Sequence, residues 1–222
     1  RPVIEEIKAR FWTTVELATY SVILAVFLGL IAGIISAIRK YSWIDVGLML
    51  VALFGVSMPN FWLGLMLIKY SAVEFQIFAP SGWGTLAQNV LPVITLGTGG
   101  AAIIARMTRS SMLEVINQDY IRTARAKGLK ERVVIFKHAL KNALIPVVTV
   151  AGLEFGGFLG GAVLTETVFA VNGMGRLMVN AINSRDFPVI QGTVLVMATL
   201  FVLVNLLVDI SYKYLNKRID VN

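Results

Sequence analysis

The sequence predicts an all-α protein, a multi-pass transmembrane helical bundle with about five spans. Of its 222 residues, 57% are apolar or aromatic and only 15% are charged, and the mean hydropathy is +0.76. A soluble domain is about 45–50% apolar even with Gly counted, and about 25% charged. A helix that crosses the bilayer core needs about 20 largely apolar residues, and several runs of this length are present. This composition excludes an ordinary water-soluble globule.

The residues that are scarce also limit the chemistry. The chain has no Cys, which excludes disulfides, thiolate metal sites and a Cys nucleophile. The single histidine, His138, has no second His or carboxylate at ligand spacing, so we expect neither a metal site nor a cofactor. The net charge of +7 does not indicate a nucleic-acid partner, because the basic residues are distributed as membrane-topology signals.

Five apolar stretches define the predicted spans. The first ends at Arg39 and Lys40, and the second contains Pro59, which removes a backbone hydrogen bond and predicts a kink. The apolar run of the third span is short, but the helix is predicted to continue past Arg106. The predicted spans cover residues 15–38, 46–73, 90–113, 143–164 and 189–212.

Lys and Arg give the orientation. With Arg39 and Lys40 in the cytoplasm, 14 of the 20 Lys and Arg residues, Lys217 and Arg218 among them, fall on that side, and six, including Arg1, fall outside. Because basic residues accumulate in cytoplasmic loops, the long loop between the third and fourth spans is predicted to be cytoplasmic. The N-terminal end is then external, and since the chain does not start at Met, we expect a further span upstream.

The cytoplasmic loop, residues 114–142, has an internal pattern. Residues 120–127 favour a short helix, Gly128 is a residue that commonly ends one, and Val133, Phe136 and Leu140 follow at helical spacing. The pattern predicts a short surface helix whose small residues permit close approach of a partner and whose cations pair with it. A basic loop held by anionic lipid headgroups fits the residues equally well.

Residues 119–146 resemble the EAA loop of binding-protein-dependent ABC importer permeases, in the version of the dipeptide and oligopeptide permease family. Gly128 stands at the glycine of that loop, Thr123 and Ala124 at its two alanines, and Arg122 where the glutamate would be. The run His138-Ala139-Leu140-Lys141 takes the later position, where the general pattern has Ile-x-Leu-Pro.

Other segments resemble the same family. They are Pro59 to Gly64, Glu166 to Phe169, Gly173 to Arg176 and Arg185 to Gly192. Asn172 departs from the pattern, because a proline often precedes the Gly-x-Gly-Arg. The resemblance covers residues 11–212 as one type I permease domain, and by this comparison the chain lacks the family's first transmembrane helix.

The resemblance implies a transmembrane subunit of an ATP-driven importer in a bacterial or archaeal cytoplasmic membrane. Implied partners are a second homologous permease, two cytoplasmic ABC ATPase subunits, an extracytoplasmic substrate-binding protein and membrane lipid. The chain has no Gly-x-x-x-x-Gly-Lys-Ser/Thr loop and is therefore expected not to be an enzyme. Di- and oligopeptides are the implied substrates, although similar proteins carry glutathione, nickel or oligosaccharides. The implied ATPase-coupling residues are Arg122, Thr123, Ala124, Arg125, Ala126, Lys127, Gly128 and His138.

Polar residues inside the spans are further candidates. Glu154 in the fourth span is expensive in the membrane, and it either lines the translocation pathway or is hydrogen-bonded or protonated for structural reasons. Asn60 either lines the pathway or caps the helix broken at Pro59. Small residues spaced by four favour close helix packing, and here they are Gly29, Gly33, Gly156, Gly157, Gly160 and Gly161.

Two other classes of membrane protein are alternatives to a permease. An intramembrane enzyme requires convergent nucleophile, base or metal-ligand groups, and the spans hold no Cys, His pair or Asp pair. A passive channel or structural membrane subunit would conduct without ATP, whereas a permease is silent without its ATPase.

Overall fold

The computed structural model describes residues 2–215, with side chains placed for residues 2–212. Arg1, Lys217 and Arg218, which are among the basic residues that indicate the orientation, lie outside the described residues. In chain order the elements are α1 (Val3–Ile38), α2 (Trp43–Ser57), α3 (Asn60–Leu67), η1 (Ile68–Glu74), α4 (Leu86–Ile116), α5 (Asp119–Ala126), α6 (Glu131–Val133), η2 (Val134–Ala139), α7 (Leu140–Gly161), α8 (Val163–Val168), α9 (Met174–Ser184) and α10 (Phe187–Leu215), where η marks π-helical segments.

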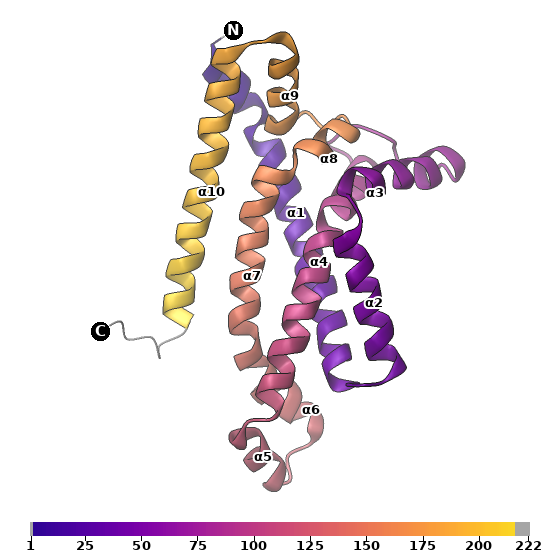
Figure 1. The fold of residues 1–222 in the computed structure, drawn as a ribbon, viewed down its shortest axis with the longest axis vertical. Helices are drawn as coiled ribbons and strands as arrows, with labels where there is room; N and C mark the ends of the chain where they lie inside the picture. The colour runs from indigo at the N-terminus through magenta and orange to yellow at the C-terminus, as the bar shows by residue number, and fades with distance from the viewer. Residues whose placement is uncertain (1, 216–222) are drawn as a thin grey trace.

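The long helices run side by side and the short ones lie at the two ends. The N-terminus and α9 lie at one end of the bundle, whereas α5 and α6 lie at the opposite end (Figure 1). Four helical stretches of the described chain are long and apolar enough to cross a membrane: α1, α4, α10 and the continuous stretch Glu131–Gly161. The predicted class, an all-α multi-pass membrane protein, is confirmed.

The second predicted span differs from expectation. Residues 46–73 do not form one kinked helix, because α2 and the α3–η1 segment meet at 102°. Proline disfavours helical geometry in the residue before it, and Met58 has ψ 128° while Pro59 has ψ 130°. Two consecutive extended residues turn the chain sharply, and α3 with η1 points away from the bundle (Figure 1).

Close packing of α1 on α4 forms the centre of the bundle. A Cβ atom on Gly29 would lie 2.6 Å from Ile104 Cγ2, and one on Gly33 would lie 2.5 Å from Thr108 Cβ and 2.6 Å from the Ala105 carbonyl oxygen. These distances are too short for real contacts, so the two helices approach each other only because both positions lack a side chain.

We therefore expect Gly33→Ala to lower the free energy of unfolding by about 1–3 kcal/mol, the usual effect of overpacking. Gly47→Ala in α2 is the matched control, because a Cβ there meets nothing within 4 Å. At an exposed helix position, Ala in place of Gly adds about 1 kcal/mol. Thermal unfolding of the two purified variants checks this, and equal midpoints would contradict the packing described.

Candidate functional site: a two-faced surface helix and its supports

The short helix α5 ends where Gly128 predicts. Gly128 has φ +77°, a left-handed conformation that Gly adopts without strain. Its N–H donates to the Arg125 carbonyl at 2.9 Å, and the Leu129 N–H donates to the Ala124 carbonyl at 3.4 Å. This pair of bonds is the Schellman motif, which satisfies the last carbonyls of a helix.

Helix α5 has one buried and one exposed face. Ile121 and Ala124 are buried and face the core of the chain itself. Ala124, which was expected to let a partner approach, has its methyl group covered by other helices of the chain. The buried cluster around these two side chains contains Ala37 of α1, Met112 of α4, Val134, Ile135 and Ala139 of η2, and Ala143 of α7. The exposed residues of α5 and its C-terminal cap are Asp119, Tyr120, Arg122, Thr123, Arg125, Ala126 and Lys127.

Acidic neighbours hold two of the exposed cations. Arg125 makes two bonds to the Glu131 carboxylate, at 2.7 and 3.1 Å, across the turn at Gly128. Arg122 lies 3.6 Å from Asp119. This ion pair is exposed to solvent, so it contributes little to stability. His138 is not on α5 but half-buried on η2.

A buried carboxylate ties three elements together near α5. Asp45 at the start of α2 makes a bidentate pair with Arg109 of α4, with Nε–Oδ1 at 2.7 Å and Nη2–Oδ2 at 2.8 Å. It also accepts bonds from the Ser36 hydroxyl of α1 and from the Tyr41 N–H at 2.9 Å. The ends of α1, α2 and α4 are thus held as a unit.

A second buried carboxylate, Glu166, organises the opposite end. Its Oε1 accepts from the Thr14 hydroxyl of α1 at 2.6 Å, and its Oε2 accepts from the Arg176 N–H at 2.9 Å. The Met174 N–H in turn donates to Thr14 Oγ1 at 2.9 Å. Glu166 therefore caps the first turn of α9, where the helix dipole favours an acceptor. Burial raises the pKa of this carboxyl, while its hydrogen bonds from Thr14 and the backbone act in the opposite direction.

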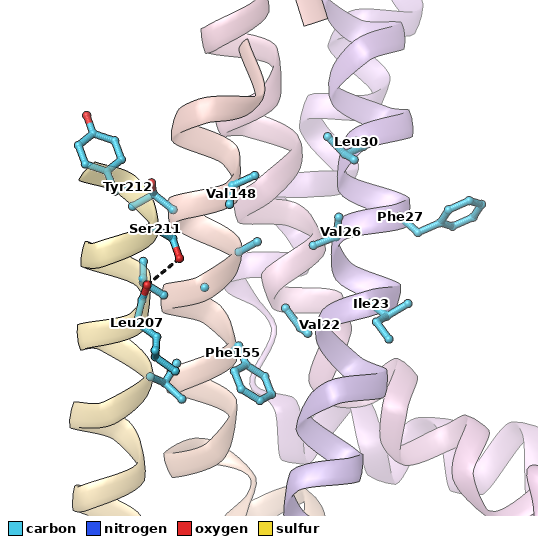
Figure 2. A pocket seen from close by; sticks show the side chains of 15 residues that line it. Val22, Ile23, Val26, Phe27, Leu30, Val148, Phe155, Leu207, Ser211 and Tyr212 are labelled. Atoms are coloured by element: carbon cyan, nitrogen blue, oxygen red, sulfur yellow. Dashed lines mark hydrogen bonds between the residues drawn. The ribbon is translucent and has the colours of Figure 1, made fainter. Parts of the chain in front are cut away.

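A groove on one side of the bundle is apolar. It has a volume of about 680 Å³ and is lined by α1, α7 and α10. Figure 2 shows Val22 and Val26 of α1 on the side of Phe155 of α7, and Leu207 of α10 beside α7. The Ser211 hydroxyl on its rim already donates to the Leu207 carbonyl at 2.7 Å. With so few free polar groups, this groove suits lipid chains or an apolar helix rather than a hydrophilic substrate.

The polar and glycine candidates of the spans fall in different surroundings. Asn60 and Glu154 are both half-buried against α4. Gly156 faces Asn205 of α10, 3.4 Å from a Cβ placed there. In contrast, Gly157, Gly160 and Gly161 lie on an exposed side of α7, and a Cβ on any of them meets nothing within 4 Å. The packing expected at these three glycines has no counterpart among the described residues.

The structure is thus a multi-pass helical bundle with a capped, two-faced basic helix at one end. The sequence profile of the binding-protein-dependent transport system inner membrane component family matches residues 29–221, and the chain belongs to that family. It is an ABC importer permease subunit, as the sequence predicted. Membership of this family implies an ATPase and a substrate-binding protein as partners.

Similar proteins agree with this assignment. The dipeptide transport system permease protein DppB of Alkalihalophilus pseudofirmus is 48% identical, in an alignment that covers 99% of this chain and 74% of that protein. The glutathione transport system permease protein GsiC of Escherichia coli K12 is 45% identical, over 99% of this chain and 72% of that protein. An inward-facing structure of the MetNI methionine ABC transporter has the same fold, with a TM-score of 0.82, 18% identity and coverage of 97% of this chain and 99% of that chain.

Sequence reasoning missed the two buried carboxylates. Asp45 sits three residues after Ser42, whose side chain accepts from the Asp45 N–H at 3.3 Å. This is the Ser-x-x-acid spacing of a helix start, and it was readable in the sequence. Glu166 was noted only as part of a motif. Its burial depends on Thr14, which is 152 residues away, and no local pattern reports such a contact.

Helix α5 supplies a matched pair of variants. Ala124→Leu should loosen the helix, because it forces a larger side chain into a filled cluster at a cost of about 1–3 kcal/mol. Ala126→Leu, on the exposed face of the same helix, should leave the fold unchanged. Trypsin cleavage after Arg122 and Arg125 measures the difference, and equal cleavage rates for the two variants would contradict the burial of Ala124.

Glu166 makes stability depend on pH. A carboxyl whose pKa is higher in the folded state binds its proton more tightly there, so the free energy of unfolding should fall as pH rises from the ordinary value of 4.5 through the raised one. Glu166→Gln should abolish this decline, whereas Glu114→Gln at an exposed position of α4 should retain it. Urea unfolding at a series of pH values tests this, and an unchanged slope in Glu166→Gln would refute the role.

Proposed function

We propose that this chain is one transmembrane subunit of an ATP-driven importer that carries di- or oligopeptides across a bacterial or archaeal cytoplasmic membrane. The relatives named for dipeptide and glutathione transport support the substrate class, since both carry peptides. In this proposal the chain pairs with a second homologous permease, two cytoplasmic ABC ATPase subunits supply the energy, and an extracytoplasmic binding protein delivers the peptide. Membrane lipid surrounds the assembly.

The observation that carries the proposal is the two-faced α5. Its exposed side presents cations and the small Ala126, which suits an acidic groove on an ATPase subunit. Its buried side, Ile121 and Ala124, is held by α1, α4, η2 and α7. A displacement of α5 is therefore passed to several spans at once rather than absorbed by a loose loop.

The Asp45–Arg109 pair extends this connection. Met112, in the cluster under α5, lies one turn from Arg109 on α4, and Arg109 is bonded to Asp45 of α2. Movement of α5 would thus reach α2 through a short charged bridge as well as through apolar contacts. Closure of an ATPase dimer around α5 would rock the spans between inward-open and outward-open states.

Crosslinking tests the contact directly, because the chain has no native Cys. In the assembled importer, Ala126→Cys should crosslink efficiently to an ATPase subunit carrying a Cys in its docking groove. Lys40→Cys is the control, since it is exposed at the same end of the bundle but lies in the turn between α1 and α2. Stronger crosslinking of Lys40→Cys than of Ala126→Cys would refute α5 as the docking element.

Transport measurements test the coupling. Proline in place of Gly128 cannot adopt φ +77° and has no N–H to donate to the Arg125 carbonyl, so Gly128→Pro should remove the C-terminal cap of α5. ATP-driven peptide uptake should fall by at least about tenfold, which corresponds to a disturbance of roughly 1.4 kcal/mol, while ATP hydrolysis continues. Full uptake by this variant, or uptake by the native protein without ATP, would contradict the proposal.

A further inference from the structure

Two polar side chains within the spans approach α4 at consecutive glycines. A Cβ placed on Gly99 would lie 3.9 Å from Asn60 Oδ1, and one placed on Gly100 would lie 3.1 Å from Glu154 Oε2. Asn60 begins α3 and Glu154 lies on α7, so the two side chains reach α4 from different helices. At Gly100 the space of a side chain is already filled, because a Cβ there would lie 2.7 Å from Phe158 Cζ.

Glu154 has no partner of its own. Across the described residues its carboxylate makes no hydrogen bond and no ion pair. The groups around Gly100, where Oε2 lies, are the Phe158 ring and the Ala25 methyl. A carboxylate only accepts hydrogen bonds when ionised, and leaving one unpaired among apolar groups is costly. An ionised Glu154 would therefore need a hydrogen-bond donor from outside the described residues.

Access to Glu154 is open along one side of α7. Gly157 and Gly161 follow Glu154 by three and seven residues, so they share its side of the helix. Both are exposed, and no atom lies within 4 Å of a Cβ placed on either. The apolar groove uses a different side of α7, where Phe155 and Val148 point toward α1 and α10 (Figure 2). The carboxylate thus lies beside the open, glycine-lined side of α7 and away from the apolar groove.

We propose that Glu154 binds the terminal ammonium group of the peptide during its passage through the membrane. This inference rests on the proposed function and adds the part of the substrate that is recognised. An ammonium supplies hydrogen-bond donors and a positive charge, and both match an ionised carboxylate. A divalent cation fits less well, because Ca²⁺ takes six to eight oxygen ligands and one carboxylate falls far short.

A Cys reporter beside Glu154 tests the site in the assembled importer. Gly157→Cys is modified with a cationic reagent, trimethylammonioethyl methanethiosulfonate, and with an anionic one, sulfonatoethyl methanethiosulfonate. A nearby carboxylate attracts the cation and repels the anion, so Glu154→Gln should lower the ratio of the two rates by about tenfold. Val148→Cys in the apolar groove is the control, and its modification should be slow with both reagents.

Substrate protection identifies the recognised group. Dialanine should slow modification of Gly157→Cys by the cationic reagent, and N-acetyl-dialanine, which lacks the ammonium, should not. Protection should vanish in Glu154→Gln and persist in Glu154→Asp, which retains the charge. The inference is overturned if Gly157→Cys is unreactive, if its rate ratio is unchanged in Glu154→Gln, or if both peptides protect equally.

The proposed function has its own readout in the same preparation. Uptake of dialanine by the importer with native Glu154 measures peptide transport without any reporter. If ATP-driven uptake is normal but Glu154→Gln leaves the modification rates of Gly157→Cys unchanged, only the ammonium site is refuted. Absence of dialanine uptake, together with absence of protection, removes the peptide assignment itself.

Discussion

The anchoring of α5 by Ile121 and Ala124 is the contact on which the account of this permease depends. A helix of eight residues is too short to be stable in water by itself, so its position comes from the helices beneath it. The two buried side chains occupy a cluster contributed by α1, α4, η2 and α7. The exposed basic face is consequently presented at a fixed angle, and a push on that face acts on the bundle instead of bending a loop.

The acidic residues of this chain differ in whether the chain itself supplies their hydrogen-bond partners. Asp45 and Glu166 are buried near opposite ends of the bundle, and each is satisfied by several donors. They fix helix ends, as buried acids with complete hydrogen bonding do. Glu154 differs from both, because no group of the described chain forms a hydrogen bond or an ion pair with it. The same residue type is thus structural where it is paired, and is a candidate for substrate contact where it is not.

Glycine likewise has two uses that its spacing alone does not distinguish. Gly29 and Gly33 bring α1 onto the backbone of α4, whereas Gly157, Gly160 and Gly161 meet nothing in the described chain. Both sets have the small-residue spacing that favours helix contact. The difference arises from which side of each helix the bundle covers, and that depends on the tertiary arrangement.

The sequence predicted the features that depend on composition and local geometry. Apolar runs located the long helices, and Gly128 located the end of α5. At Pro59 the sequence correctly predicted a break in the helix but underestimated the bend. Proline also holds the preceding residue, Met58, in an extended conformation, and the two extended residues together produce a bend of 102°. Ala124 could not be assigned to a face without the position of η2. The partners of Asp45 and Glu166 come from distant segments, so no local pattern could supply them.

A structure of the assembled importer with nucleotide bound is the most direct measurement of the central claim. The account predicts the exposed face of α5 seated in a groove of an ATPase subunit, with Ile121 and Ala124 still packed against the permease. A structure in which α5 faces solvent or lipid, while the ATPase subunits hold another part of this chain, would contradict it.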